Sequence, residues 1–289
     1  MKPTRHLWLV VCLTLLLSFT LTIIGATQKS AHKRDKAGTT PSQQGLNPTC
    51  TNPSFPEPAP QKKLGIDTKC GLVGAGGKEA TQNTAKNNFC ASGTPSAVTI
   101  ASLTKLQASV EKDPTIPFGS KGPAIDRTPL QKLGEGRLVT LKAFVLFARQ
   151  EGKESVNCGT KVPNNPLFHD IHISLVDAES VSQPGDTKPV LNTKECTGVV
   201  AEMSPHHRPD KWTAGNLQKV AKAQLPVRVT GQLFFDSSHL PCANGQPVGS
   251  NPKRISLWEI HPIYKFEVCT ANCNGAGTWL PLDQWVSQQ

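Results

Sequence analysis

Five segments in the second half of the chain alternate apolar and polar residues with a period of two. They follow Gly134-Glu135-Gly136 and cover residues 137–152, 169–177, 197–203, 226–236 and 255–269. Such alternation is typical of strands that bury one face. A segment with helical character, residues 211–225, lies between the third and the fourth. The sequence therefore predicts a mainly β fold of five strands with one inserted helix.

The order strand, strand, strand, helix, strand, strand resembles that of the OB-fold, a five-stranded Greek-key barrel with a helix between its third and fourth strands. The resemblance covers residues 134–269 and rests on element order and alternation. The phrase Leu257-Trp258-Glu259-Ile260-His261-Pro262 is also similar to phrases in an uncharacterised family of exported bacterial proteins. These resemblances imply an OB-like barrel with a C-terminal extension over residues 134–289, and they imply no biochemical activity.

The N-terminus has the pattern of a targeting segment. Lys2, Arg5 and His6 precede an apolar run, residues 7–24, and Gly25-Ala26 offers small side chains for cleavage. We expect residues 1–26 to be a signal peptide that exports the protein to the periplasm or out of the cell. The apolar run is also nearly long enough to span a bilayer. An uncleaved anchor in the inner membrane, formed by residues 7–26, is therefore the alternative.

Two further parts precede the predicted barrel. Residues 27–64 are rich in proline and polar side chains, which predicts a disordered tether. Residues 65–133 predict a small helical module held together by Cys70 and Cys90. The helical character comes from apolar residues at helical spacing within residues 96–112, namely Ile100, Leu103, Leu106 and Val110.

Eight cysteines remain once Cys12, inside the apolar run, is set aside. An even number of cysteines in an exported chain predicts disulfides, up to four of them among 105 full pairings. The three residues between Cys269 and Cys273 do not match a zinc knuckle. Residues 178–195 and 237–254 are predicted to be long loops pinned by disulfides. The eight are Cys50, Cys70, Cys90, Cys158, Cys196, Cys242, Cys269 and Cys273.

The predicted strand faces also sort the polar side chains. In the second strand the isoleucines and Leu175 would face the core, which leaves Asp170 and His172 on the outer face. Pro262 in the last strand predicts a bulge or an edge, and bulges often re-aim side chains next to sites. His206, beside His207 in a loop, is expected to be solvated. The candidates for a ligand surface are Asp170, His172, Glu202, Asp236, His239, Arg254, Glu259 and His261.

Three functional hypotheses follow from the charge and from these candidates. The leading one is an exported, noncatalytic binding protein for an anionic polymer or an envelope component, because the formal net charge is +10. It expects no metal or other cofactor. The second is a metal-dependent hydrolase of phosphodiesters, in which Asp170, His172 and Glu202 would hold zinc or manganese. The third is a structural, partner-binding module whose polar side chains pair with one another.

Other chemistries fit less well. The glycine-rich residues 71–77 lack the Gly-Lys-Ser/Thr ending of a phosphate-binding loop, and no Gly-x-Ser-x-Gly elbow occurs. An OB-fold that binds nucleic acid needs exposed aromatic side chains, but the outer faces offer Phe234 and few others, and Trp258 is expected in the core. The positive charge is thus compatible with nucleic-acid binding, but the sequence does not require it. Membrane contact is expected only through an uncleaved N-terminus, and the oligomeric state is left open.

Overall fold

The computed structural model describes residues 70–289 except Pro163 and Ser250. The predicted signal peptide, residues 1–26, and the predicted tether, residues 27–64, lie outside the described residues. The described part has a mixed sheet of seven strands and six α-helices. Helices occupy about as much of it as strands do, so the prediction of a mainly β chain underestimated the helices. In the described part of the chain, no helix combines the length and apolar character needed to cross a membrane.

Five of the strands pair in a series that starts and ends at β2. The pairings lead from β2 through β3, β4, β6 and β5, and β5 pairs again with β2. In this series only β4 and β6 are parallel. Outside it, β1 lies parallel to β2, and β7 lies antiparallel to β6. The strands are β1 (Ser96–Val98), β2 (Leu138–Gln150), β3 (Ile171–Val176), β4 (Val199–Met203), β5 (Pro226–Phe235), β6 (Trp258–Ala271) and β7 (Thr278–Pro281).

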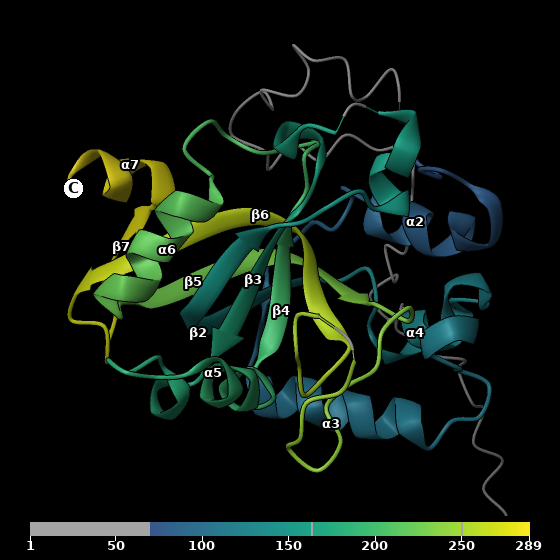
Figure 1. Cartoon of the computed structure of the whole chain (residues 1–289), viewed down its shortest axis with the longest axis horizontal. Helices are drawn as coiled ribbons and strands as arrows, with labels where there is room; N and C mark the ends of the chain where they lie inside the picture. Colours follow the sequence, from purple (N-terminus) through teal and green to yellow (C-terminus); the bar gives the residue numbers. More distant parts are fainter. Residues whose placement is uncertain (1–69, 163, 250) are drawn as a thin grey trace, which may run out of the picture. The chain divides into compact units, whose positions relative to one another are not determined.

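The helices cover this sheet from several sides (Figure 1). Contacts link α6 with β2, α5 with β3, α3 with β6, and α7 with β6 and β7. The α-helices are α2 (Ala80–Lys86), α3 (Ile100–Glu111), α4 (Thr128–Leu133), α5 (Lys188–Glu195), α6 (Ala214–Ala223) and α7 (Leu282–Ser287). The 3-10 helices are η2 (Gly77–Glu79), η3 (Gly119–Ala124), η4 (Ser155–Asn157), η5 (Gly159–Lys161), η6 (Pro166–Phe168) and η7 (Ala178–Ser180).

Most predicted elements are confirmed. The five alternating segments form β2 to β6, and the two segments with helical spacing form α3 and α6. The α3 helix begins at a capping box in which Thr99 and Ser102 exchange side-chain and backbone hydrogen bonds. The prediction of a loop over residues 178–195 is wrong, because this polar stretch contains η7 and α5. Strands β1 and β7 were not predicted, since three or four residues are too few to show alternation.

The inward faces of the strands form the main apolar core. Trp258 is fully buried there, as predicted, with its ring edge-on to Phe235 at 5.2 Å between centroids. The irregularity predicted at Pro262 is present, because the β5–β6 register shifts around Gly231. A Cβ atom on Gly231 would lie 2.3 Å from the carbonyl oxygen of Pro262. Glycine thus allows the two backbones to approach closely at this point.

Three disulfides join described residues: Cys70–Cys158, Cys196–Cys242 and Cys269–Cys273. Cys90 is disulfide-bonded as well. Cys70 and Cys90 were expected to hold a module over residues 65–133 together, but Cys70 joins Cys158, in the segment that follows β2 and outside that module. Cys196–Cys242 joins the end of the 178–195 stretch, before β4, to the 237–254 stretch, after β5, so both stretches are held by a disulfide as predicted. These bonds are consistent with an oxidising environment.

Candidate functional site

The eight candidate residues lie together around the ends of strands β3 to β6. Direct contacts connect four of them in a chain from His172 through Glu202 and His261 to Glu259. Asp170 has a potential ligand atom within 4.8 Å of those of Glu202 and His261. We call these eight residues the polar cluster: Asp170, His172, Glu202, Asp236, His239, Arg254, Glu259 and His261.

The polar cluster is buried under α2. From this helix Lys86 donates to Glu202 at 3.1 Å, and Gln82 donates to Asp236 at 3.1 Å. Gln232 of β5 donates in turn to the backbone carbonyl of Ala85 at 2.9 Å. The outer face of these strands was expected to be exposed to solvent. In the structure α2 covers it, and the polar side chains between them form a second, polar interior. Phe234, expected on the outside, is also fully buried and lies beneath the Lys86 ammonium.

Glu202 is the central carboxylate of the cluster. Its Oε2 accepts hydrogen bonds from Lys86 Nζ at 3.1 Å and from His261 Nδ1 at 2.6 Å. Its Oε1 lies 3.0 Å from Nε2 of His172. Burial would raise the pKa of Glu202, but His172, Lys86 and His261 hold that pKa well below its usual range. Glu202 is therefore an ionised carboxylate surrounded by cationic and donor groups.

His172 acts as a cation between carboxylates. Its Nδ1 lies 3.2 Å from Glu151, and its Nε2 lies 3.6 Å from Glu154. Burial would lower the pKa of His172, but Glu202 and Glu154 raise it well above its usual value. Both ring nitrogens thus face acidic partners. This geometry fits an ion-paired imidazolium and leaves His172 poorly placed as a metal ligand.

The side of the cluster nearest α4 is compensated by its own cations. Asp236 lies 2.8 Å from Nδ1 of His239, and Arg254 Nη1 donates to Glu259 at 2.8 Å. Burial favours a high pKa for Asp236, yet His239 and Lys86 hold this pKa well below its usual range. Burial, with the negative charges of Glu202 and Asp236, raises the pKa of Glu259 well above its usual value.

Asp170 differs from the other carboxylates of the cluster. It is 0% exposed, and neither of its carboxylate oxygens has a hydrogen-bond partner among the described residues. Burial and the nearby charge of Glu154 raise the pKa of Asp170 to about 6. Leaving a buried polar group unsatisfied costs on the order of 1 to 3 kcal/mol, and more for a charged group. In a native structure such a group calls for a specific explanation, such as a bound ion or a functional role.

Asp170, Glu202 and His261 together have the chemistry of a metal site. Their ligand atoms lie within 4.8 Å of one another, and all three residues are 0% exposed. In the tautomer that donates from Nδ1 to Glu202, His261 keeps its lone pair on Nε2, which is buried without a partner. A carboxylate that orients a ligand histidine in this way is common at zinc sites. The carboxylate of Asp170 and the imidazole of His261 suit zinc or manganese, and Glu202 would be the orienting carboxylate.

Two other groups in the described residues satisfy the same distance criterion, Glu154–Asp170–His172 and Glu202–Asp236–Glu259. The first contains the imidazolium of His172. The second already has Lys86 close to Glu202 and Asp236. The Asp170–Glu202–His261 group differs from both, because it combines the unpartnered carboxylate of Asp170 with Nε2 of His261, a buried ring nitrogen that contacts no carboxylate among the described residues.

Sequence reasoning missed three charged members of this region: Lys86, Glu151 and Glu154. The two glutamates lie just beyond the end of β2, within reach of His172. Lys86 follows Gln82 by four residues, which places both on one face of α2. That spacing was visible in the sequence, but it occurs in many solvated helices.

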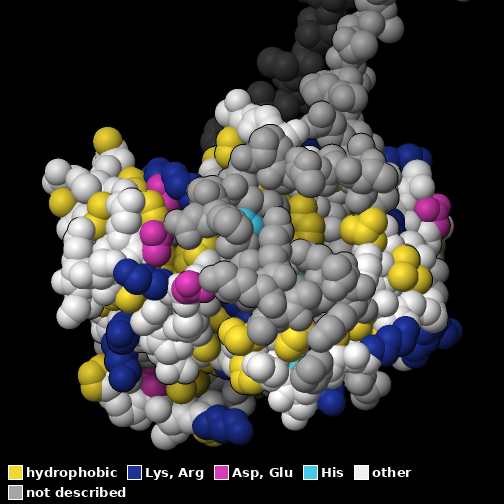
Figure 2. Space-filling model, turned by 90° about the horizontal axis from the view of Figure 1, so that it is seen from above, with side chains coloured by type: hydrophobic (Ala, Val, Ile, Leu, Met, Phe, Trp, Pro, Cys, Tyr) yellow, Lys and Arg dark blue, Asp and Glu magenta, His cyan; other side chains and the backbone are white. Residues whose placement is uncertain are grey.

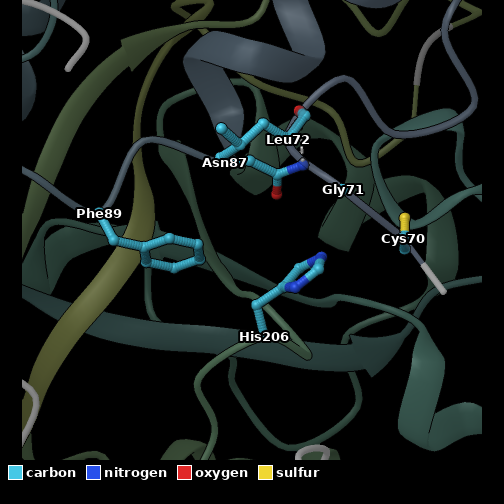
Figure 3. A pocket seen from close by; sticks show the side chains of 6 residues that line it. All are labelled: Cys70, Gly71, Leu72, Asn87, Phe89 and His206. Atoms are coloured by element: carbon cyan, nitrogen blue, oxygen red, sulfur yellow. Dashed lines mark hydrogen bonds between the residues drawn. The ribbon is translucent and has the colours of Figure 1, made fainter. Parts of the chain in front are cut away.

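His206 lies apart from the polar cluster. It is half-buried rather than solvated, which corrects the prediction, and it lines a cavity of about 200 Å³ (Figure 3). The other lining residues are Cys70, Gly71, Leu72, Asn87 and Phe89. This cavity lies between the segment around α2 and the loop after β4.

Comparison with protein-family models, with curated proteins and with solved structures finds no match to this chain. Functional conclusions therefore depend on the geometry of the polar cluster and of its surroundings.

Proposed function

We propose that this protein binds a divalent transition-metal ion, zinc or manganese, through Asp170 and Nε2 of His261, with Glu202 orienting the imidazole through its Nδ1–H. The observation that carries the proposal is the carboxylate of Asp170, which is fully buried and has no hydrogen-bond partner. A cation at this position would compensate that charge and would also use the free Nε2 of His261. The ion would thus satisfy two orphaned groups at once.

A purely structural network explains less of this geometry. Buried charges that serve only stability are paired, because an unpaired one costs several kcal/mol. Glu202 and Asp236 meet this requirement through Lys86, His261 and His239, whereas Asp170 does not. The hydrolase hypothesis requires an open coordination position for water. The complete burial of Asp170, Glu202 and His261 favours a closed site that holds its ion.

The substitution Asp170→Asn tests this proposal directly. It removes the unpaired negative charge and the main ligand while keeping the shape of the side chain. We expect purified wild-type protein to contain close to one equivalent of zinc or manganese by elemental analysis, and the variant to contain none. With metal removed by a chelator, the variant should melt at a higher temperature than the wild type, because the cost of the buried carboxylate is gone.

The matched control is Asp210→Asn, at an exposed aspartate, which should change neither metal content nor melting temperature. Wild-type protein that holds no metal, together with an Asp170→Asn variant that is less stable, would show that Asp170 has a structural role. In that case the metal proposal is wrong.

The proposal includes an OB-like barrel and export from the cytoplasm. Support for the barrel comes from the series of pairings β2–β3–β4–β6–β5–β2 and from the position of α6 between β4 and β5. The OB-fold has its helix at the corresponding place. Support for export comes from the disulfides, which persist in oxidising compartments.

A second candidate function, binding of an anionic polymer, is favoured by one outer face of the sheet. There Lys142 and Arg228 lie over the ring of Trp279, at 5.4 Å and 4.7 Å from its centroid, and Lys265 is exposed nearby in β6. Cations beside an aromatic ring suit a polymer with anionic groups. On the face seen in Figure 2, by contrast, Lys and Arg side chains are separated into several places.

Retention on immobilised heparin tests this second function. The double substitution Lys142→Ala and Arg228→Ala should lower the salt concentration needed for elution, because fewer counterions are released. The same loss from substituting Lys219 and Lys222 of α6 would show that retention depends only on the overall charge.

A further inference from the structure

The cavity lined by His206 also contains a buried polar side chain, that of Asn87, whose hydrogen bonding is incomplete. Asn87 is 2% exposed, and its Nδ2 donates to the carbonyl oxygens of Leu72 at 3.0 Å and Val156 at 3.3 Å. Its Oδ1 is buried and has no hydrogen-bond partner in the part of the chain that the structure describes. In Figure 3 this oxygen points into the cavity, between Phe89 and His206. The cavity therefore presents one unused hydrogen-bond acceptor.

The amide orientation of Asn87 is fixed by its other contacts. Both Nδ2 hydrogen bonds go to backbone carbonyls, which can only accept. Rotating the amide would place its oxygen against these two acceptors. The oxygen is thus held toward the cavity by the α2 segment on one side and by the chain after β2 on the other, where Cys70–Cys158 joins the same two segments.

The remaining walls select for size and shape. The ring of Phe89 forms one side and the imidazole of His206 approaches from below, with 6.2 Å between ring centroids and an interplanar angle of 57°. Leu72 and the disulfide sulfur of Cys70 complete a largely apolar lining. An apolar cavity of about 150 Å³ in a protein core can hold benzene. The present cavity, about 200 Å³, has room for a six-membered ring with one substituent.

We infer that this cavity is a binding site for a small hydroxylated aromatic compound of the phenol class. The ring lies against Phe89 and Leu72, and the hydroxyl donates its hydrogen bond to Oδ1 of Asn87. Such a ligand would bury its apolar ring in the cavity and would also give Oδ1 of Asn87 the hydrogen bond that it lacks. The site is independent of the proposed metal ligands, none of which lines the cavity.

Phenol and toluene are the probes that test this inference, because they have the same shape and differ in the donor. Binding of each to the full-length protein is measured by NMR titration, with intermolecular NOEs to locate the ring. Toluene is the more hydrophobic and would win in a purely apolar cavity. We expect phenol to bind about two- to tenfold more tightly than toluene, which is the range for one net hydrogen bond, with NOEs to Phe89 and to the side-chain amide of Asn87.

Protein variants complete the test. Phe89→Ala removes a wall and should weaken phenol binding at least fivefold, whereas Val190→Ala, at an exposed apolar side chain outside the cavity, should not change it. Circular dichroism verifies that each variant is folded. Toluene binding as tightly as phenol, NOEs to another part of the protein, or no binding of either compound at millimolar concentration would each overturn the inference.

Discussion

Strands β5 and β6 carry ion pairs at both ends, and the two ends differ in burial. At one end Arg228 donates two hydrogen bonds to Glu267, at 2.7 Å and 2.8 Å; the side chain of Arg228 is 30% exposed and that of Glu267 is 5% exposed. At the other end, Asp236 follows β5 and Glu259 lies in β6, and both side chains are 0% exposed. The same two strands thus hold similar residue types in two different environments.

The comparison shows how burial changes the role of a charge. Near water, an ion pair is screened and contributes about 0 to 1 kcal/mol. In the interior, each ion loses its hydration, and removing its partner leaves a charge that costs several kcal/mol. Asp236 and Glu202 therefore depend on α2, which supplies Lys86. In the pair of Arg228 and Glu267 only the carboxylate is buried, and Glu267 has a second cation, Lys265, at 2.8 Å, so it depends less on any one partner.

The largest difference between the two ends is expected for loss of a lysine. Lys86→Met removes the ammonium between Glu202 and Asp236 and should lower the free energy of unfolding by about 3 to 5 kcal/mol. Lys265→Met, next to Glu267, should lower it by less than about 1 kcal/mol. Denaturant unfolding at pH 7 in the presence of a chelator measures both. Equal effects of the two substitutions would contradict the distinction drawn here.

The next effect, on metal affinity, is expected for a change that keeps one hydrogen bond of the polar cluster. In His261→Asn, the amide N–H can replace the Nδ1–H that donates to Glu202, but nothing replaces Nε2. Metal affinity, measured by competition with a chelating dye, should fall by more than the roughly 10- to 100-fold typical of losing an outer-shell partner. His239→Asn, at the half-exposed edge of the cluster, should leave it unchanged. A similar loss in both variants would show that the ligand set is wrong.

The smallest effect concerns the pH dependence of the end that contains Arg228 and Glu267. Burial alone would raise the pKa of Glu267, but hydrogen bonds from Arg228 and Lys265 lower it below its usual value. A lowered pKa means that ionised Glu267 stabilises the fold above about pH 4.5, and that this contribution is lost as the pH falls through the folded-state pKa. Glu267→Gln should therefore cost about 0.5 to 1 kcal/mol at pH 7.

Unfolding measured from pH 7 to pH 3 provides the test. The difference between wild type and Glu267→Gln should decrease below pH 4.5. A difference that stays constant over this range would mean that Glu267 contributes through packing and not through its charge.

The strand alternation was enough to identify the polar cluster. Asp170 and His172 were assigned to the face opposite Ile171 and Ile173, and the register of β3 and β4 places His172 directly opposite Glu202. Period two fixes which side chains share a face, so pairing of the strands brings these residues together. Their burial was not predictable, because the covering helix precedes β5 and β6 by well over a hundred residues and is short and polar.

The sequence by itself determined the order of the main strands, the two longer helices and the candidate residues of the polar cluster, because these follow from local periodicity. Only the tertiary structure decided that Lys86 compensates Glu202, that Cys70 joins Cys158, and that Asp170 and Asn87 keep unpaired oxygens. Each of these depends on contacts between distant segments. Whether a buried charge has a partner depends on which segment packs over it, and the sequence around the charged residue does not identify that segment.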